Sequence, residues 1–132
     1  QHFREQNVEY NLTGMDILSD FYYQNPDFQT SVLEDPNIKI LWNTDSTQKS
    51  SYDQFEESQF NFIIDDGLHT SASQIVFFQE AFKYLEDDGL FIVEDVFENA
   101  FMGFLNQNNY KYQIVNFDNS NSRLVLIYKN IQ

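Results

Sequence analysis

The sequence contains no cysteine, and its 132 residues include only four glycines and two prolines. Without cysteine, the chain cannot use disulfide bonds, thiol catalysis or thiolate ligands to a metal. Lysine and arginine together number only seven against 21 acidic residues, which gives a formal net charge of −14. Because so few cations cannot neutralise a phosphate backbone or an anionic membrane surface, we expect neither nucleic acid nor a membrane as a partner.

The sequence also has no apolar run that approaches the length of a membrane-spanning helix. Its first residues contain no apolar core of a signal peptide, so we expect a cytoplasmic protein. Hydrophobic residues nevertheless make up 42% of the chain and aromatic residues 17%. That content predicts a single globular domain over residues 1–132. The 14 phenylalanines and 8 tyrosines also leave room for the interface of a homo-oligomer.

Two apolar stretches of strand-forming residues each run directly into a pair of acidic residues. They are Phe60–Ile64, followed by Asp65 and Asp66, and Gly89–Val93, followed by Glu94 and Asp95. A short continuous apolar run of this kind is typical of a strand buried in a parallel sheet. Ligands of open α/β sheets bind outside the carboxyl ends of such strands, so this edge is the predicted functional site.

The rest of the pattern alternates helices with strands. We expect strands at about 11–16, 38–42, 60–65, 89–93, 112–117 and 123–128, and helices at about 3–7, 17–23, 51–55, 70–86 and 97–107. The core-facing side predicted for the helix at 70–86 consists of Ile75, Phe78, Phe82 and Leu85. A polar turn at 118–122 predicts that the last two strands form an antiparallel hairpin. The expected fold is therefore α/β, with a mostly parallel sheet and an antiparallel end.

Carboxylates that converge on one edge repel one another unless a cation joins them. Hard oxygen donors select Mg²⁺, Mn²⁺ or Ca²⁺ over softer metals. A single aspartate at a strand end is more often a turn or cap residue than a ligand, and that interpretation stays open. His69 follows Asp66 by three residues on the same loop, where a neutral imidazole could serve as a general base.

The stretches 64–69 (IDDGLH) and 89–96 (GLFIVEDV) together resemble the class I S-adenosylmethionine-dependent methyltransferases. The closest subgroup is the metal-dependent sugar O-methyltransferases of the macrocin and mycinamicin type, with their cephalosporin-hydroxylase-like relatives. Leu68 stands where that subgroup usually has serine, and the resemblance extends from about residue 3 to residue 129. It implies a Rossmann-like sheet, S-adenosylmethionine as cofactor, Mg²⁺ or Mn²⁺, and a hydroxyl group of a small molecule or sugar as acceptor.

The resemblance also implies a role for individual residues. The implied metal ligands are Asp66, Glu94 and Asp95, and His69 is the implied base. The implied cofactor-binding residues are Asp16 at the ribose hydroxyls, Asp45 and Ser46 at the adenine, and Asp65, which would face the amino-acid end or support the loop. Asp16 also suits the N-cap of the helix expected after it, so a structural interpretation of this residue stays open.

The chain departs from the family in its glycines, since it contains no G-x-G motif. The family's first strand and glycine-rich turn would precede residue 1, and that strand would lie between the strands near Leu12 and Ile63. We therefore expect a piece of a longer protein, or a gap filled by another segment or subunit, and poor cofactor affinity for this piece alone. The same departure favours an alternative, a non-catalytic methyltransferase-like module for binding or assembly. A phospho-receiver domain fits poorly, because Lys129 follows the terminal hairpin strand.

Overall fold

The computed structural model describes residues 9–18, 32, 34–118 and 120–129. The chain divides after Ser46 into two compact units, and each unit is described by itself. The helix expected at 3–7 lies outside the described residues, as do residues 19–23 of the helix expected after Asp16.

The first unit contains two parallel strands, β1 (Leu12–Met15) and β2 (Ile38–Leu41). Their register pairs Leu12 with Ile38 and continues in step to the end of both strands. Both strands lie where the sequence predicts them. Beyond their carboxyl ends, the backbone N–H of Asp16 donates to the carbonyl of Leu41 at 3.1 Å.

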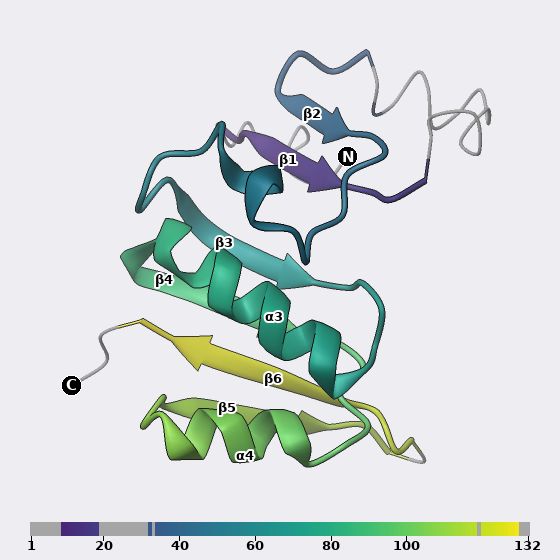
Figure 1. Ribbon diagram of the computed structural model, residues 1–132, viewed down its shortest axis with the longest axis vertical. Coiled ribbons are helices and arrows are strands. Elements are labelled where there is room, and N and C mark those ends of the chain that lie inside the picture. Colours follow the sequence, from purple (N-terminus) through teal and green to yellow (C-terminus); the bar gives the residue numbers. More distant parts are fainter. Residues whose placement is uncertain (1–8, 19–31, 33, 119, 130–132) are drawn as a thin grey trace. The chain divides into compact units, whose positions relative to one another are not determined.

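The second unit contains a four-stranded sheet with the order β3-β4-β6-β5. Its strands are β3 (Phe60–Asp65), β4 (Leu85–Val93), β5 (Tyr112–Asn116) and β6 (Arg123–Tyr128). β3 and β4 are parallel, whereas β6 runs antiparallel to both β4 and β5 (Figure 1). The predicted mixed α/β fold with parallel strand pairs and an antiparallel C-terminal hairpin is thereby confirmed.

The described residues of this unit also form two α-helices and two 3-10 helices. They are η3 (Lys49–Tyr52), α3 (Ser71–Ala81), η4 (Phe82–Tyr84) and α4 (Ala100–Gln107). α3 begins where predicted because the side chain of Thr70 caps it, accepting a hydrogen bond from the N–H of Ser73 at 3.3 Å. No helix within the described ranges is long and apolar enough to cross a bilayer.

The predicted end of the 70–86 helix is wrong, because α3 ends at Ala81 and β4 begins at Leu85. Phe60 pairs with Leu85 and Phe62 with Leu90, so two steps along β3 correspond to five along β4. The extra residues form a bulge, which helical periodicity cannot reveal. A Cβ at Gly89 would lie 2.6 Å from Cγ of Leu85, so the bulge requires glycine.

The core lies between the sheet and the two α-helices, which cover the same face of it (Figure 1). Its largest fully buried side chains include Phe78, Phe91 and Phe101, and the ring centroids of Phe78 and Phe91 lie 5.0 Å apart. The buried side of α3 is formed by Ser71, Gln74, Phe77, Phe78 and Ala81. The predicted apolar side is therefore only partly right, because Phe82 and Leu85 lie beyond the helix.

Candidate functional site

The two predicted strand ends lie side by side at one edge of the four-stranded sheet. Asp65 pairs with Val93 in the parallel register of β3 and β4, and the N–H of Glu94 donates to the carbonyl of Asp65 at 2.9 Å. From α3, the buried amide of Gln74 donates to the carbonyl of Glu94 at 3.2 Å. These bonds hold the residues that follow both strands at the same edge.

Three side chains from these strand ends form a cluster at the edge. Nε2 of His69 lies 3.9 Å from Oδ1 of Asp66 and 3.8 Å from Oδ2 of Asp95. One potential ligand atom from each residue lies within 4.8 Å of the other two. Ligands of Mg²⁺ or Ca²⁺ sit about 2.0–2.6 Å from the ion, so atoms spaced in this way can share one ion after small rotations. Solvent reaches all three side chains, which leaves an approach for a ligand.

Glu94, an expected metal ligand, is not part of this group. In the portion of the chain that the structure describes, the group of three contains Asp66, His69 and Asp95, with the imidazole where the carboxylate of Glu94 was expected. Glu94 itself is half-buried, and the described bonds involve its backbone. The roles of these four residues stay predictions.

Asp95 is held in place from two sides. Its φ angle of 50° lies in the left-handed region, which aspartate tolerates better than most residues. The hydroxyl of Ser122, from the turn between β5 and β6, donates to Oδ1 of Asp95 at 2.5 Å. This contact could not be predicted from the sequence, because the 118–122 segment indicates only a polar turn.

Asp65 differs from its neighbours in being buried, with 7% of its surface exposed. Its Oδ1 accepts a hydrogen bond from the N–H of Gly67 at 3.1 Å, while Oδ2 has no hydrogen-bond partner among the described residues. Burial disfavours the charged form and raises the pKa of Asp65 to about 6, although the Gly67 bond acts in the opposite direction. Its predicted contact with a cofactor is untested.

In the first unit, the predicted cofactor residues follow the two parallel strands. Oδ1 of Asp16 accepts a hydrogen bond from the N–H of Leu18 at 2.8 Å, which is the bond expected of an N-cap. The N–H of Thr44 donates to the carbonyl of Asp16 at 2.9 Å, so the segment that carries Asp45 and Ser46 begins beside Asp16. Their roles toward a cofactor also stay predictions.

No protein-family model and no curated protein sequence matches the chain. Several solved structures share its fold. The 1,6-didemethyltoxoflavin-N1-methyltransferase of Burkholderia thailandensis has a TM-score of 0.62 and 13% identity over 97% of this chain and 64% of its own. The MycE methyltransferase of the mycinamycin pathway, in complex with Mg and SAH, has a TM-score of 0.59 and 17% identity over 92% and 38%. An rRNA methylase from Streptococcus thermophilus has a TM-score of 0.64 and 11% identity over 93% and 75%.

At these identities the comparisons establish the fold. The chain has the Rossmann-like α/β fold found in S-adenosylmethionine-dependent methyltransferases. It spans 53% of the length of another matched structure, a protein of Bordetella parapertussis, and 38% of MycE. Because unrelated activities can share one fold, function has to be argued from the site.

Proposed function

We propose that the chain belongs to an S-adenosylmethionine-dependent, divalent-metal-dependent O-methyltransferase that acts on a hydroxyl group of a small molecule or sugar. The observation that supports this proposal most strongly is the cluster of Asp66, His69 and Asp95 at the carboxyl edge of β3 and β4. The bound Mg and SAH of MycE, a protein of the same fold, also support it.

The donor atoms of the cluster fit a hard divalent cation. Asp66 and Asp95 offer carboxylate oxygens, and the adjacent Glu94 is the expected third acidic ligand. A divalent cation bound there would lower the pKa of the acceptor's hydroxyl group. The Ser122 bond and the left-handed backbone at Asp95 orient this carboxylate before any ligand arrives.

In this proposal His69 acts as the general base. Its Nε2 lies less than 4 Å from both carboxylates, so it would also lie close to a hydroxyl group held between them. His69 would accept the hydroxyl proton, and the sulfonium group of bound S-adenosylmethionine would supply the methyl group to the acceptor oxygen. Correct orientation of the two reactants would supply much of the rate.

The cofactor would be bound by residues that follow several strands. Asp16 would accept hydrogen bonds from the ribose hydroxyls, Asp45 and Ser46 would lie against the adenine, and Asp65 would contact the amino-acid end.

Isothermal titration calorimetry on the full-length protein tests this proposal. We expect S-adenosylhomocysteine to bind, and Mg²⁺ to bind in a manner that Asp66→Asn weakens at least about tenfold. Asp53→Asn, which neutralises an exposed acid outside the site, is the matched control and should leave Mg²⁺ affinity unchanged. Failure of both ligands to bind would refute the proposal. The remaining possibility would then be a non-catalytic module, whose biological role Asp66→Ala and His69→Ala should leave intact.

A further inference from the structure

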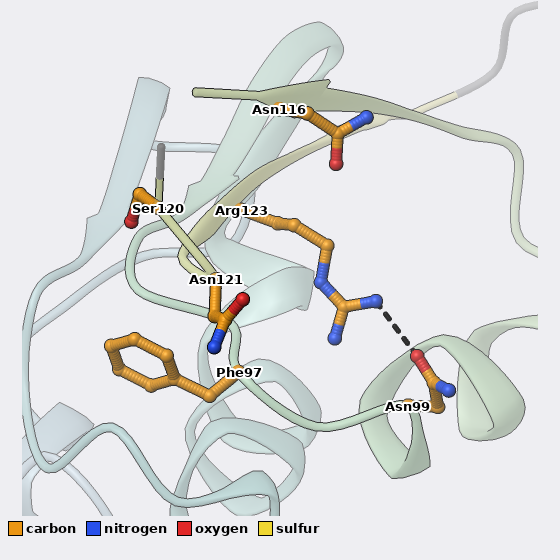
Figure 2. A pocket seen from close by; sticks show the side chains of 6 residues that line it. All are labelled: Phe97, Asn99, Asn116, Ser120, Asn121 and Arg123. Carbon is orange, nitrogen blue, oxygen red and sulfur yellow. Dashed lines mark hydrogen bonds between the residues drawn. The ribbon is translucent and has the colours of Figure 1, made fainter. Parts of the chain in front are cut away.

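A pocket of about 480 Å³ lies where the turn between β5 and β6 meets the connection from β4 to α4 (Figure 2). Its lining comes from three segments of the second unit. The lining residues are Phe97, Asn99, Asn116, Ser120, Asn121 and Arg123. They include one cation, three amides and one hydroxyl group, and none of them is acidic, although the chain has 21 acidic residues.

Arg123 is the charged group of this pocket, and it is held in a fixed position. Its Nε donates to the carbonyl of Val96 at 3.0 Å, and one terminal nitrogen donates to Oδ1 of Asn99 at 2.7 Å (Figure 2). Both partners are neutral, and no carboxylate of the described residues pairs with the guanidinium. By contrast, Lys129 lies 3.8 Å from Asp87.

A half-buried arginine with only neutral partners retains an uncompensated positive charge and N–H groups for a further acceptor. Arginine forms its strongest hydrogen bonds with carboxylate and phosphate groups, because its planar fork matches their oxygens. The neighbouring amides and hydroxyl group can donate to the same group without introducing a repelling charge. The exposed ring of Phe97 adds an apolar wall.

The pocket adjoins the candidate metal cluster. Ser122, which bonds to Asp95, immediately precedes Arg123, and the N–H of Val96 donates to the carbonyl of Arg123 at 3.0 Å. Phe97 follows Asp95 by two residues, so their Cα atoms lie within roughly 8 Å of each other. The segments that line the pocket therefore adjoin the segment that carries Asp95.

We propose that the pocket around Arg123 binds a carboxylate or phosphate group of the methyl acceptor, which would therefore be an anionic hydroxy compound such as a sugar acid or sugar phosphate. This inference rests on the proposed function for the identity of the ligand as acceptor. The anion-binding property of the pocket follows from Arg123 and its neutral surroundings alone.

NMR of the ¹⁵N-labelled protein tests the inference through the Nε–H signal of Arg123, in the presence of EDTA and without cofactor. The probes are glucuronate, glucose 6-phosphate and the neutral methyl glucoside. We expect at least one anionic probe to shift the signal saturably and the neutral probe to bind at least about tenfold more weakly. The anionic probe that binds identifies the group as carboxylate or phosphate. Equal binding of the neutral probe, or no saturable shift with either anionic probe, would overturn the inference.

Substitutions separate anion binding from folding. Arg123→Gln should lower the affinity for the anionic probe at least about tenfold. Arg123→Lys should lower it less, because lysine keeps the positive charge but lacks the planar pair of N–H donors. Asn121→Asp places a repelling carboxylate at an exposed position of the lining and leaves the arginine intact, so it should also weaken binding. Lys111→Gln removes one exposed charge outside the lining and should change affinity less than about twofold. If Asn121→Asp and Arg123→Gln both bind the probe normally, the inference is wrong.

The outcomes distinguish a failure of this inference from a failure of the proposed function. Saturable binding of an anionic probe by a protein that binds neither S-adenosylhomocysteine nor Mg²⁺ would support the pocket and refute the methyltransferase. Binding of cofactor and metal with no anionic probe in the pocket would refute this inference and leave the methyltransferase in place.

Discussion

At the scale of single residues, Asp65 and His69 lie four positions apart in very different surroundings. Asp65 is buried, and one of its oxygens has no hydrogen-bond partner in the described part of the chain, whereas solvent reaches His69, which faces two carboxylates. The sequence predicts both residues at this edge of the sheet, since the apolar run of β3 ends there. Their different environments could not be predicted, because the burial of Asp65 depends on tertiary packing.

The raised pKa of Asp65 predicts a pH-dependent contribution to stability. An exposed aspartate has a pKa of 3.8, and burial raises that of Asp65 to about 6, so the folded state binds the proton more tightly than the unfolded state. The protonated side chain therefore stabilises the fold fully below pH 3.8, and this contribution is lost as the pH rises to about 6. A shift of this size is worth roughly 3 kcal/mol at most.

Urea denaturation of the wild type and of Asp65→Asn, in EDTA between pH 4 and pH 7, measures this contribution directly. As the pH rises, we expect the free energy of unfolding of the wild type to fall by up to about 3 kcal/mol relative to that of the variant. Asp53→Asn, at an exposed position, should show the same pH dependence of the free energy of unfolding as the wild type. If the free energy of unfolding changes with pH in the same way for the wild type and Asp65→Asn, the pKa of Asp65 is not raised by folding.

Nε2 of His69 lies at nearly the same distance from both carboxylates, so its position is compatible with a general base and with a metal ligand. The substitution His69→Gln distinguishes the two roles. If His69 is the base, Mg²⁺ affinity stays within about threefold while methyl transfer falls by roughly 10²–10⁴-fold. Calorimetry with Mg²⁺ and a methyl-transfer assay with saturating Mg²⁺ measure the two effects. A large loss of Mg²⁺ affinity, with transfer restored by excess metal, would instead assign His69 to the ion.

At the scale of elements, the strands were predicted more accurately than the segments that join them. β6 lies at the predicted residues 123–128, because a continuous apolar run with a polar turn before it admits few alternatives. The early end of α3 was missed, since Phe82 and Leu85 continue the helical spacing of Phe78 by chance. The pocket was missed as well, because its residues come together only through the pairing of β4 with β6.

The bulge in β4 predicts a specific cost for Gly89→Ala. The added Cβ would lie 2.6 Å from Cγ of Leu85 and 2.9 Å from the carbonyl oxygen of Glu86, and Leu85 is fully buried. We expect a loss of about 1–3 kcal/mol in the free energy of unfolding, measured by urea denaturation. Gly103→Ala is the control, because a Cβ there meets no atom within 4 Å and alanine favours the helix α4. Equal stability of Gly89→Ala and the wild type would contradict the bulge.

At the scale of the whole molecule, the formal net charge of −14 makes the response to salt informative. Any salt screens repulsion among exposed carboxylates, but only a specific site distinguishes Mg²⁺ from Na⁺ at equal ionic strength. The acidic strand ends could be located from the sequence, because each follows a short apolar run. The sequence did not reveal that Asp66, His69 and Asp95 form the group, since the direction of each side chain depends on loop conformation.

Thermal unfolding in MgCl₂ and in NaCl of equal ionic strength measures this distinction. A ligand at about 100 times its Kd stabilises the folded state by about 2.7 kcal/mol, and each kcal/mol raises Tm by roughly 2–8 °C in a domain of this size. We therefore expect a higher Tm in MgCl₂, and the difference should disappear in Asp95→Asn. Asp88→Asn, at an exposed position in the β4 bulge, should retain it. Equal Tm values in the two salts would argue against a specific site.

The most direct test of the account is a titration with Mn²⁺ followed by paramagnetic broadening of backbone amide NMR signals. If Asp66 and Asp95 hold one cation beside His69, substoichiometric Mn²⁺ will selectively broaden the signals of residues 65–69 and 94–96. EDTA will restore these signals, and Asp66→Asn will prevent the broadening. Broadening spread over the acidic surface, or centred on residues 87–88, would contradict the account.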